Sequence, residues 1–158
     1  MGEPRFGLGF DVHSFGERAP LRLGGMEFPG VPGLVGHSDG DAVCHAVADA
    51  LLGAAALGDI GLHFPETDPG MAGISGLELL TRTVALLAER SLAPWSADVT
   101  VVADRPAVAP LRDEMRGVLA GALGVPVERV SVKATRPEGL GLSGDGIGCL
   151  ALAVLAET

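Results

Sequence analysis

The hydrophobic pattern alternates along the chain between the period of a strand and the period of a helix. Residues 5–13 carry an apolar side chain at every second position, which predicts a strand whose apolar row meets a helical layer: Phe6, Leu8, Phe10 and Val12. Further strands are expected at 21–28, 98–103, 130–135 and 147–155. Residues 58–73 and 139–148 are predicted to be loops because glycine, proline and polar residues interrupt the pattern there.

Three helices are expected between these strands, at 39–57, from Ser75 onward, and from Leu111 to near Gly124. Ser75 and Glu78 form a capping box, and Ser38 with Asp41 resembles one. The helix at 39–57 has two different stripes, an apolar one of Val43, Val47, Leu51 and Ala54 and a polar one of Asp41, His45 and Asp49.

The last strand, at 147–155, has apolar residues on both of its faces. This predicts a sheet that is covered on both sides. Three helices cover one face of a small sheet, so the other face needs a partner, and a second subunit is the simplest one. We therefore predict an α/β protein of the α+β type. It is a two-layer sandwich of a small mixed sheet with about three helices on one face, a single domain over residues 1–158, in which the sheets of several subunits pack together.

Composition and charge narrow the function. The 158 residues have a formal net charge of −9, which argues against nucleic-acid binding, because neutralisation of phosphates dominates that affinity. Neither a membrane-spanning segment nor a secretory signal is visible. The two cysteines, Cys44 and Cys149, fit no disulfide framework or metal spacing, so a reducing, cytoplasmic location is expected.

Asp11, His13 and His45 are the candidate metal ligands. Alternate residues of a strand share a face, so Asp11 and His13 point together, and His45 projects from the following helix. Three such ligands with an open fourth position are typical of catalytic zinc, and the imidazoles favour zinc over magnesium. The alternative, that each histidine is an ordinary surface or core residue, stays open on spacing alone.

Three other segments offer groups that bind phosphates or a base. His37 and Ser38 lie at a helix N-terminus, where anions are favoured, although Ser38 is alternatively only a cap. At a strand end, Thr135 and Arg136 suit phosphates and Glu138 suits a hard divalent ion, the alternative being a solvated turn. The loop at 103–109 has backbone groups for a base, or is a plain connection.

Taken together, five segments resemble one family closely, the 2-C-methyl-D-erythritol 2,4-cyclodiphosphate synthases of non-mevalonate isoprenoid synthesis. They are residues 9–15, 37–41 with His45, 49–61, 64–68 and 133–135. The resemblance implies a homotrimer with active sites between subunits. It also implies conversion of 4-diphosphocytidyl-2-C-methyl-D-erythritol 2-phosphate to the cyclic diphosphate and CMP, with one Zn²⁺ per site and Mg²⁺ or Mn²⁺ on the substrate diphosphate.

The resemblance also implies site residues. It assigns zinc binding to Asp11, His13 and His45, and binding of the second metal to Glu138. The residues expected to contact substrate are Asp11, His13, His37, Ser38, Asp59, Ile60, Gly61 and the loop Phe64, Pro65, Glu66, Thr67 and Asp68. The residues expected to contact cytidine are Ala103, Asp104, Arg105, Pro106, Ala107, Val108, Ala109 and Thr135.

The chain departs from the family pattern at three places. Arg136 and Pro137 stand where a hydroxyl residue usually follows Thr135, and we assign Arg136, with His37, to charge stabilisation of the reacting phosphates. Leu142 and Asp145 replace an aromatic residue and an arginine beside the trimer axis, and Ala107 replaces a basic residue of the cytidine loop.

Two other functions compete with this interpretation. A zinc hydrolase would need a general base, for which Asp41 or Asp49 is the candidate. A non-catalytic binding module would have structural zinc with a closed fourth position, for which His63 is the candidate ligand.

Overall fold

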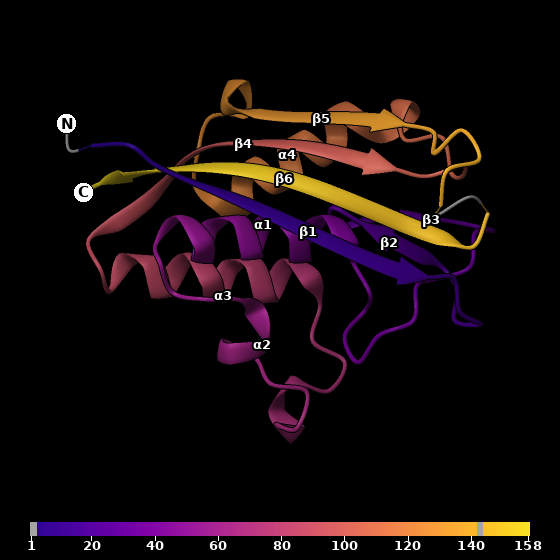
Figure 1. The fold of residues 1–158 in the computed structure, drawn as a ribbon, viewed down its shortest axis with the longest axis horizontal. Helices are drawn as coiled ribbons and strands as arrows, with labels where there is room; N and C mark the ends of the chain where they lie inside the picture. The colour runs from indigo at the N-terminus through magenta and orange to yellow at the C-terminus, as the bar shows by residue number, and fades with distance from the viewer. Residues whose placement is uncertain (1–2, 142–143) are drawn as a thin grey trace.

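The computed structural model describes residues 3–141 and 144–158 and arranges them as a sheet covered on one side by helices (Figure 1). Within these residues, a four-stranded sheet has the order β1-β6-β4-β5. Its strands are β1 (Arg5–Ser14), β4 (Leu92–Val102), β5 (Val130–Thr135) and β6 (Gly146–Glu157). Strand β6 pairs antiparallel with β1 and β4, whereas β4 and β5 are parallel, so the sheet is mixed as predicted.

Three long helices, α1 (Ala42–Ala54), α3 (Gly76–Ala88) and α4 (Arg112–Leu123), pack on the same side of the sheet (Figure 1). The capping box of Ser75 and Glu78 is confirmed, because the Ser75 side chain accepts the Glu78 N–H. Helix α4 ends at Gly124, whose φ of 69° provides the left-handed cap. The predicted α+β class with helices on one face is confirmed.

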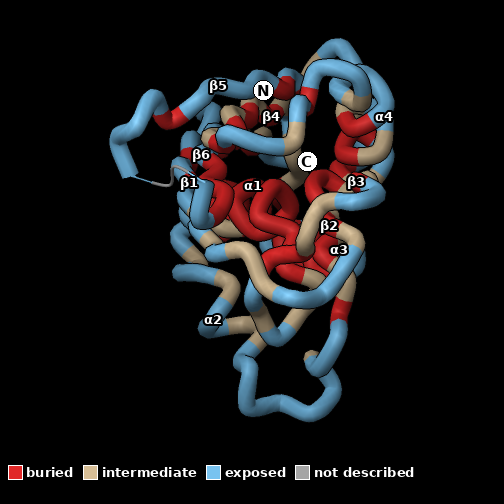
Figure 2. Tube along the Cα trace, turned by 90° about the vertical axis from the view of Figure 1, so that its right-hand side faces the viewer, coloured by how far each residue is buried: buried red, intermediate tan, exposed pale blue. Residues whose placement is uncertain are grey.

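Helix α1 forms the centre of the core, and nearly all of its residues are buried (Figure 2). It begins later than predicted, at Ala42, because the side chain of Asp41 and not of Ser38 accepts the N–H of the first turn. It ends at Ala54 instead of 57, before Ala56 and Gly58 adopt positive φ angles.

The predicted orientation of the first strand is wrong. Phe6, Leu8, Phe10 and Val12 are the exposed row, and Leu8 is 67% exposed. The glycine row faces α1 instead, because a Cβ on Gly7 or Gly9 would lie less than 3.0 Å from the backbone of that helix. The strand and the helix can pack closely because Gly7 and Gly9 have no side chains. The apolar character of the opposite row does not decide which face is covered.

The remaining differences are local. The strand expected at 21–28 is a hairpin of β2 (Leu21–Leu23) and β3 (Met26–Phe28), turned by Gly24 and Gly25 with positive φ angles. The region at 58–73 contains α2 (Ile60–His63) and η1 (Pro69–Met71). Further 3₁₀ turns are η2 (Ala109–Leu111) and η3 (Val127–Arg129). Within the described residues, every helix is too short or too polar to span a membrane.

Candidate metal centre

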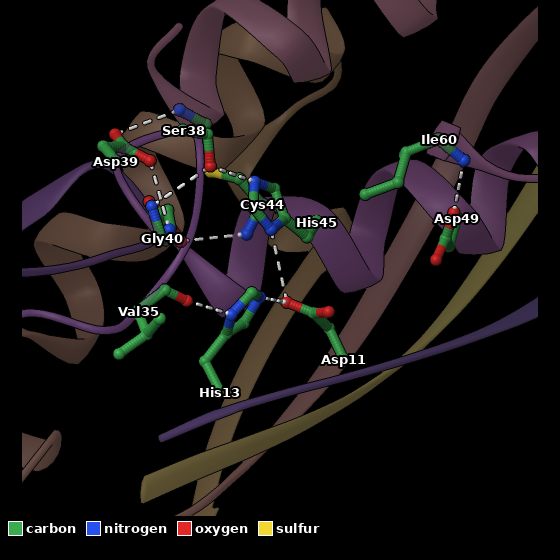
Figure 3. Close-up of polar contacts among 12 residues, drawn as sticks. Asp11, His13, Val35, Ser38, Asp39, Gly40, Cys44, His45, Asp49 and Ile60 are labelled. Carbon is green, nitrogen blue, oxygen red and sulfur yellow. Dashed lines mark hydrogen bonds and ion pairs between the residues drawn. The ribbon is translucent and has the colours of Figure 1, made fainter. Parts of the chain in front are cut away.

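Asp11, His13 and His45 converge at the sheet edge where β1 lies against α1 (Figure 3). The inward row of β1 continues from the two glycines to Asp11 and His13, so both side chains face the helix. One ligand atom of each residue lies within 4.8 Å of the others, and within residues 3–141 and 144–158 this is the one His/Cys/Asp/Glu cluster with such geometry. The predicted convergence is therefore confirmed.

The three side chains leave polar atoms without hydrogen-bond partners. Asp11 Oδ2 lies 2.8 Å from His13 Nε2 and 3.3 Å from His45 Nδ1. Nevertheless, Asp11 Oδ2 and His13 Nε2 are buried and, among the described residues, make no hydrogen bond of acceptable geometry. Buried polar atoms are rarely left in this state, and a cation between them would satisfy all three groups.

The other nitrogen of each imidazole is held by a neighbour. His13 Nδ1 lies 2.6 Å from the Val35 carbonyl oxygen, which fixes Nδ1 as the donor and leaves Nε2 free toward Asp11. His45 Nε2 lies 3.1 Å from Ser38 Oγ, with Nδ1 turned toward Asp11. Such outer partners orient metal-binding imidazoles, and sequence reasoning missed Val35 because a backbone acceptor has no sequence signal.

The electrostatics of the cluster favour a negative carboxylate beside imidazoles. Burial raises the pKa of Asp11, but its contacts with His13 and His45 outweigh burial and lower that pKa to about 2. Contact with Asp11 raises the pKa of His13, against the opposing effect of burial. The carboxylate is therefore ionised at neutral pH, as metal coordination requires.

The donor set fits a metal ion. One carboxylate and two imidazoles match the ligands of catalytic zinc, and the fourth side is open because all three residues line a cavity of about 230 Å³. His63, the candidate fourth ligand, lies elsewhere: its Nε2 is 2.7 Å from the Leu57 carbonyl oxygen. The closed structural site that His63 would have formed is therefore ruled out.

The cavity brings together most of the predicted substrate residues. Beyond the three ligands it is lined by His37, Ser38, Ile60, Gly61, Phe64 and Glu66. Asp59, Pro65, Thr67 and Asp68 do not line it, and the prediction missed Gly36, Met71, Ala72, Ile74 and Leu79. The missed apolar residues lie on the segment that leads into α3 and in α3 itself. Their hydrophobic pattern is the same as that of any core segment.

An ion pair joins the two sides of the cavity mouth. His37 Nε2 lies 3.2 Å from Glu66 Oε2, and both side chains are largely exposed. This contact connects the turn before α1 with the loop after α2, and both segments were predicted to contact substrate.

The carboxylates considered as hydrolase bases have other partners. Asp41 is fully buried and accepts the backbone N–H groups of Gly24, Gly25 and Cys44. Asp49 accepts the Ile60 N–H at 2.8 Å. Neither residue lines the cavity, so the general base of the hydrolase hypothesis is missing at these positions.

The predicted cytidine and second-metal residues lie elsewhere in the chain. Residues 103–109 follow β4, and Thr135, Arg136 and Glu138 end or follow β5, two and three strands from β1. The Ala103 N–H donates to the Thr135 carbonyl at 3.1 Å, which joins these two segments. None of them lines the metal cavity. Leu142 lies outside the described residues.

Known proteins are similar to this chain in sequence and in fold. A model of the YgbB family matches residues 4–156. The 2-C-methyl-D-erythritol 2,4-cyclodiphosphate synthase of Symbiobacterium thermophilum is 51% identical over 95% of this chain and 97% of its own length. A solved 2C-methyl-D-erythritol-2,4-cyclodiphosphate synthase in a CDP-bound form has a TM-score of 0.89 at 36% identity, covering 96% of this chain and 100% of its own. The bifunctional IspDF of Campylobacter jejuni has a TM-score of 0.93 at 37% identity, covering 99% of this chain and 43% of its own. The chain therefore belongs to the YgbB family and is a member of the 2-C-methyl-D-erythritol 2,4-cyclodiphosphate synthases.

Proposed function

We propose that this enzyme cyclises 4-diphosphocytidyl-2-C-methyl-D-erythritol 2-phosphate at the Asp11, His13 and His45 centre, releasing CMP. The observation that carries the proposal is the three-ligand cluster whose open side faces a cavity lined by most of the predicted substrate residues. Curated relatives named for this product support the choice of reaction.

The reaction needs no deprotonated side chain as a nucleophile. An oxygen of the substrate's 2-phosphate attacks the β-phosphorus, forming one P–O bond, while the bond from that phosphorus to the bridging oxygen of CMP breaks. The enzyme's contribution is to hold the two phosphates together and to offset their charge. Such a reaction does not require Asp41 or Asp49 to act as a general base, and both carboxylates accept backbone N–H groups instead.

Offsetting phosphate charge is difficult in a chain with a net charge of −9. Asp11, His13 and His45 would hold Zn²⁺, which when bound supplies Lewis-acid stabilisation to the β-phosphate. Glu138 would share Mg²⁺ or Mn²⁺ with the substrate diphosphate. His37 at the cavity mouth and Arg136 after β5 would donate hydrogen bonds to phosphate oxygens.

The functional molecule is proposed to be a homotrimer of single-domain subunits. The outer face of the sheet exposes Phe6, Leu8, Phe10, Val12, Leu150 and Leu152, a continuous apolar surface on the neighbouring strands β1 and β6. Packing these faces together would bring the 103–109 loop and Thr135 of one subunit to the metal cavity of the next. The cytidine moiety would then bind there, as the CDP-bound relative suggests. A cytoplasmic location is proposed with it.

Product analysis tests the activity. The protein is incubated with the diphosphocytidyl substrate and magnesium, and the products are identified by mass spectrometry. The cyclic diphosphate and CMP are expected, and both should disappear after full metal chelation and return with zinc. Simple hydrolysis products, or CMP release that survives chelation, would falsify the proposal.

A further inference from the structure

Ser38 belongs to the turn that precedes α1, and its side chain faces the metal ligand His45 (Figure 3). Its Oγ accepts the Gly40 backbone N–H at 3.1 Å and also lies 3.1 Å from His45 Nε2. His45 is 5% exposed, and within residues 3–141 and 144–158 Ser38 is the one hydrogen-bond partner of its Nε2. Hydrogen bonding at the Nε2 side of this ring therefore depends on a single side chain.

The direction of the Ser38–His45 hydrogen bond follows from proton counting. A hydroxyl has two lone pairs and one hydrogen, and the Gly40 N–H occupies one lone pair because a backbone nitrogen only donates. One lone pair and the O–H hydrogen remain available to His45. Either group can pair with Nε2, depending on which ring nitrogen carries the proton.

Metal binding selects one of these two arrangements. His45 Nδ1 is the nitrogen turned toward the cluster, 3.3 Å from Asp11 Oδ2. A nitrogen that binds a metal is unprotonated, so the proton of the neutral imidazole must be on Nε2. His45 Nε2–H then donates to the second lone pair of Ser38 Oγ.

We propose that Ser38 is a positioning residue for the metal ligand His45, selecting the Nε2–H tautomer and fixing the ring so that Nδ1 meets the metal. The inference rests on the metal centre of the proposed function but not on the reaction. Because Ser38 accepts two hydrogen bonds in this arrangement, its own hydrogen stays available to a phosphate oxygen in the cavity it lines. The residue thus acts on the metal ligand in addition to contacting substrate.

The Val35 carbonyl holds His13 in the same way, but a backbone acceptor is not removed by substitution. Ser38 is therefore the outer partner that mutagenesis can test. Loss of such a partner typically weakens metal affinity by about 10- to 100-fold.

The test measures zinc affinity of the full chain by competition with a chelator, for wild type, Ser38→Ala, Ser38→Thr and Ser131→Ala. Ser38→Ala should raise the Kd about tenfold. Ser38→Thr keeps the hydroxyl and should restore most of the affinity that Ser38→Ala loses. Ser131→Ala removes an exposed serine hydroxyl on β5 and should have no effect. Equal affinities for wild type and Ser38→Ala, or equal weakening by Ala and Thr, overturn the proposal.

A second measurement needs no variant. Histidine-ring ¹H–¹⁵N spectra of the zinc-loaded wild type should show a His45 Nε2–H protected from exchange. A spectrum with zinc on Nε2, or with an unprotected Nε2–H, overturns the proposal even if Ser38→Ala does not fold. Undiminished zinc binding by His45→Ala would instead overturn the metal centre and the proposed function.

Discussion

Gly9 of β1 lies directly against Ala46 of α1, so closely that a Cβ on Gly9 would come within 3.0 Å of the Ala46 carbonyl oxygen. This contact sets the distance between the strand that carries Asp11 and His13 and the helix that carries His45. The metal centre therefore depends on a residue with no side chain.

Gly9→Ala should lower the free energy of unfolding by about 2–3 kcal/mol, because the added methyl group must push the strand from the helix backbone. Zinc affinity should fall as well, since the same movement separates the ligands. Denaturant unfolding and zinc titration check both effects. Gly117→Ala in α4 is the control: apart from its own stretch of helix, nothing lies within 4 Å of a Cβ added there, so the free energy of unfolding should rise by up to about 1 kcal/mol.

His45→Ala should lower turnover by at least ~10²-fold, since it removes one of three ligands of the group that offsets phosphate charge. The rate of CMP release measures this loss. A rate within a few-fold of wild type would remove His45 from the site.

Zinc affinity should increase with pH. The Asp11 contact raises the pKa of His13, so in the metal-free protein that contact stabilises the fold fully below pH 6.5 and is lost as pH rises through the raised value. Zinc must displace this proton, and each displaced proton changes the Kd by up to about tenfold per pH unit. A titration series from pH 6 to 8 should show the Kd falling by roughly tenfold or more. A Kd that does not change with pH would contradict this prediction. His63→Gln is the control: the His63 ring is paired with the Leu57 carbonyl oxygen, so this variant should show the same pH dependence of the Kd.

Leu8→Glu should convert the proposed trimer to monomers, because it places a charge on the exposed apolar face of the sheet. Activity should disappear with the trimer, while zinc binding persists, since all three ligands come from one chain. Sedimentation velocity and zinc titration separate the two. Val127→Glu, at a residue 37% exposed outside the sheet face, should leave the assembly intact. A monomeric wild type, or a trimeric Leu8→Glu, would count against this assembly.

Arg136→Thr should keep CMP release at or above the wild-type rate. Threonine supplies the hydroxyl that the family pattern has after Thr135, and Arg136 is exposed after β5, so the fold does not depend on it. A collapse of the rate would show that the guanidinium has an indispensable role in this chain.

The strand and helix periods identified most elements, including β5 at the residues predicted and the Ser75 cap of α3. They also grouped two of the three metal ligands, because Asp11 and His13 share a strand face by alternation alone. The start of α1 was less predictable, since Ser38 and Asp41 both suit a helix cap. The choice depended on Gly24 and Gly25, which donate to Asp41 from a hairpin distant in sequence.

The sequence by itself determined which side chains lie together on each element, because the backbone period is local. Only the tertiary structure decided which face of β1 the helix covers. Hydrophobicity favoured the row of Phe6, Leu8 and Phe10, but α1 packs on the glycine row because only there can the two backbones approach closely. That choice turns Asp11 and His13 toward His45 and leaves the apolar row for another surface.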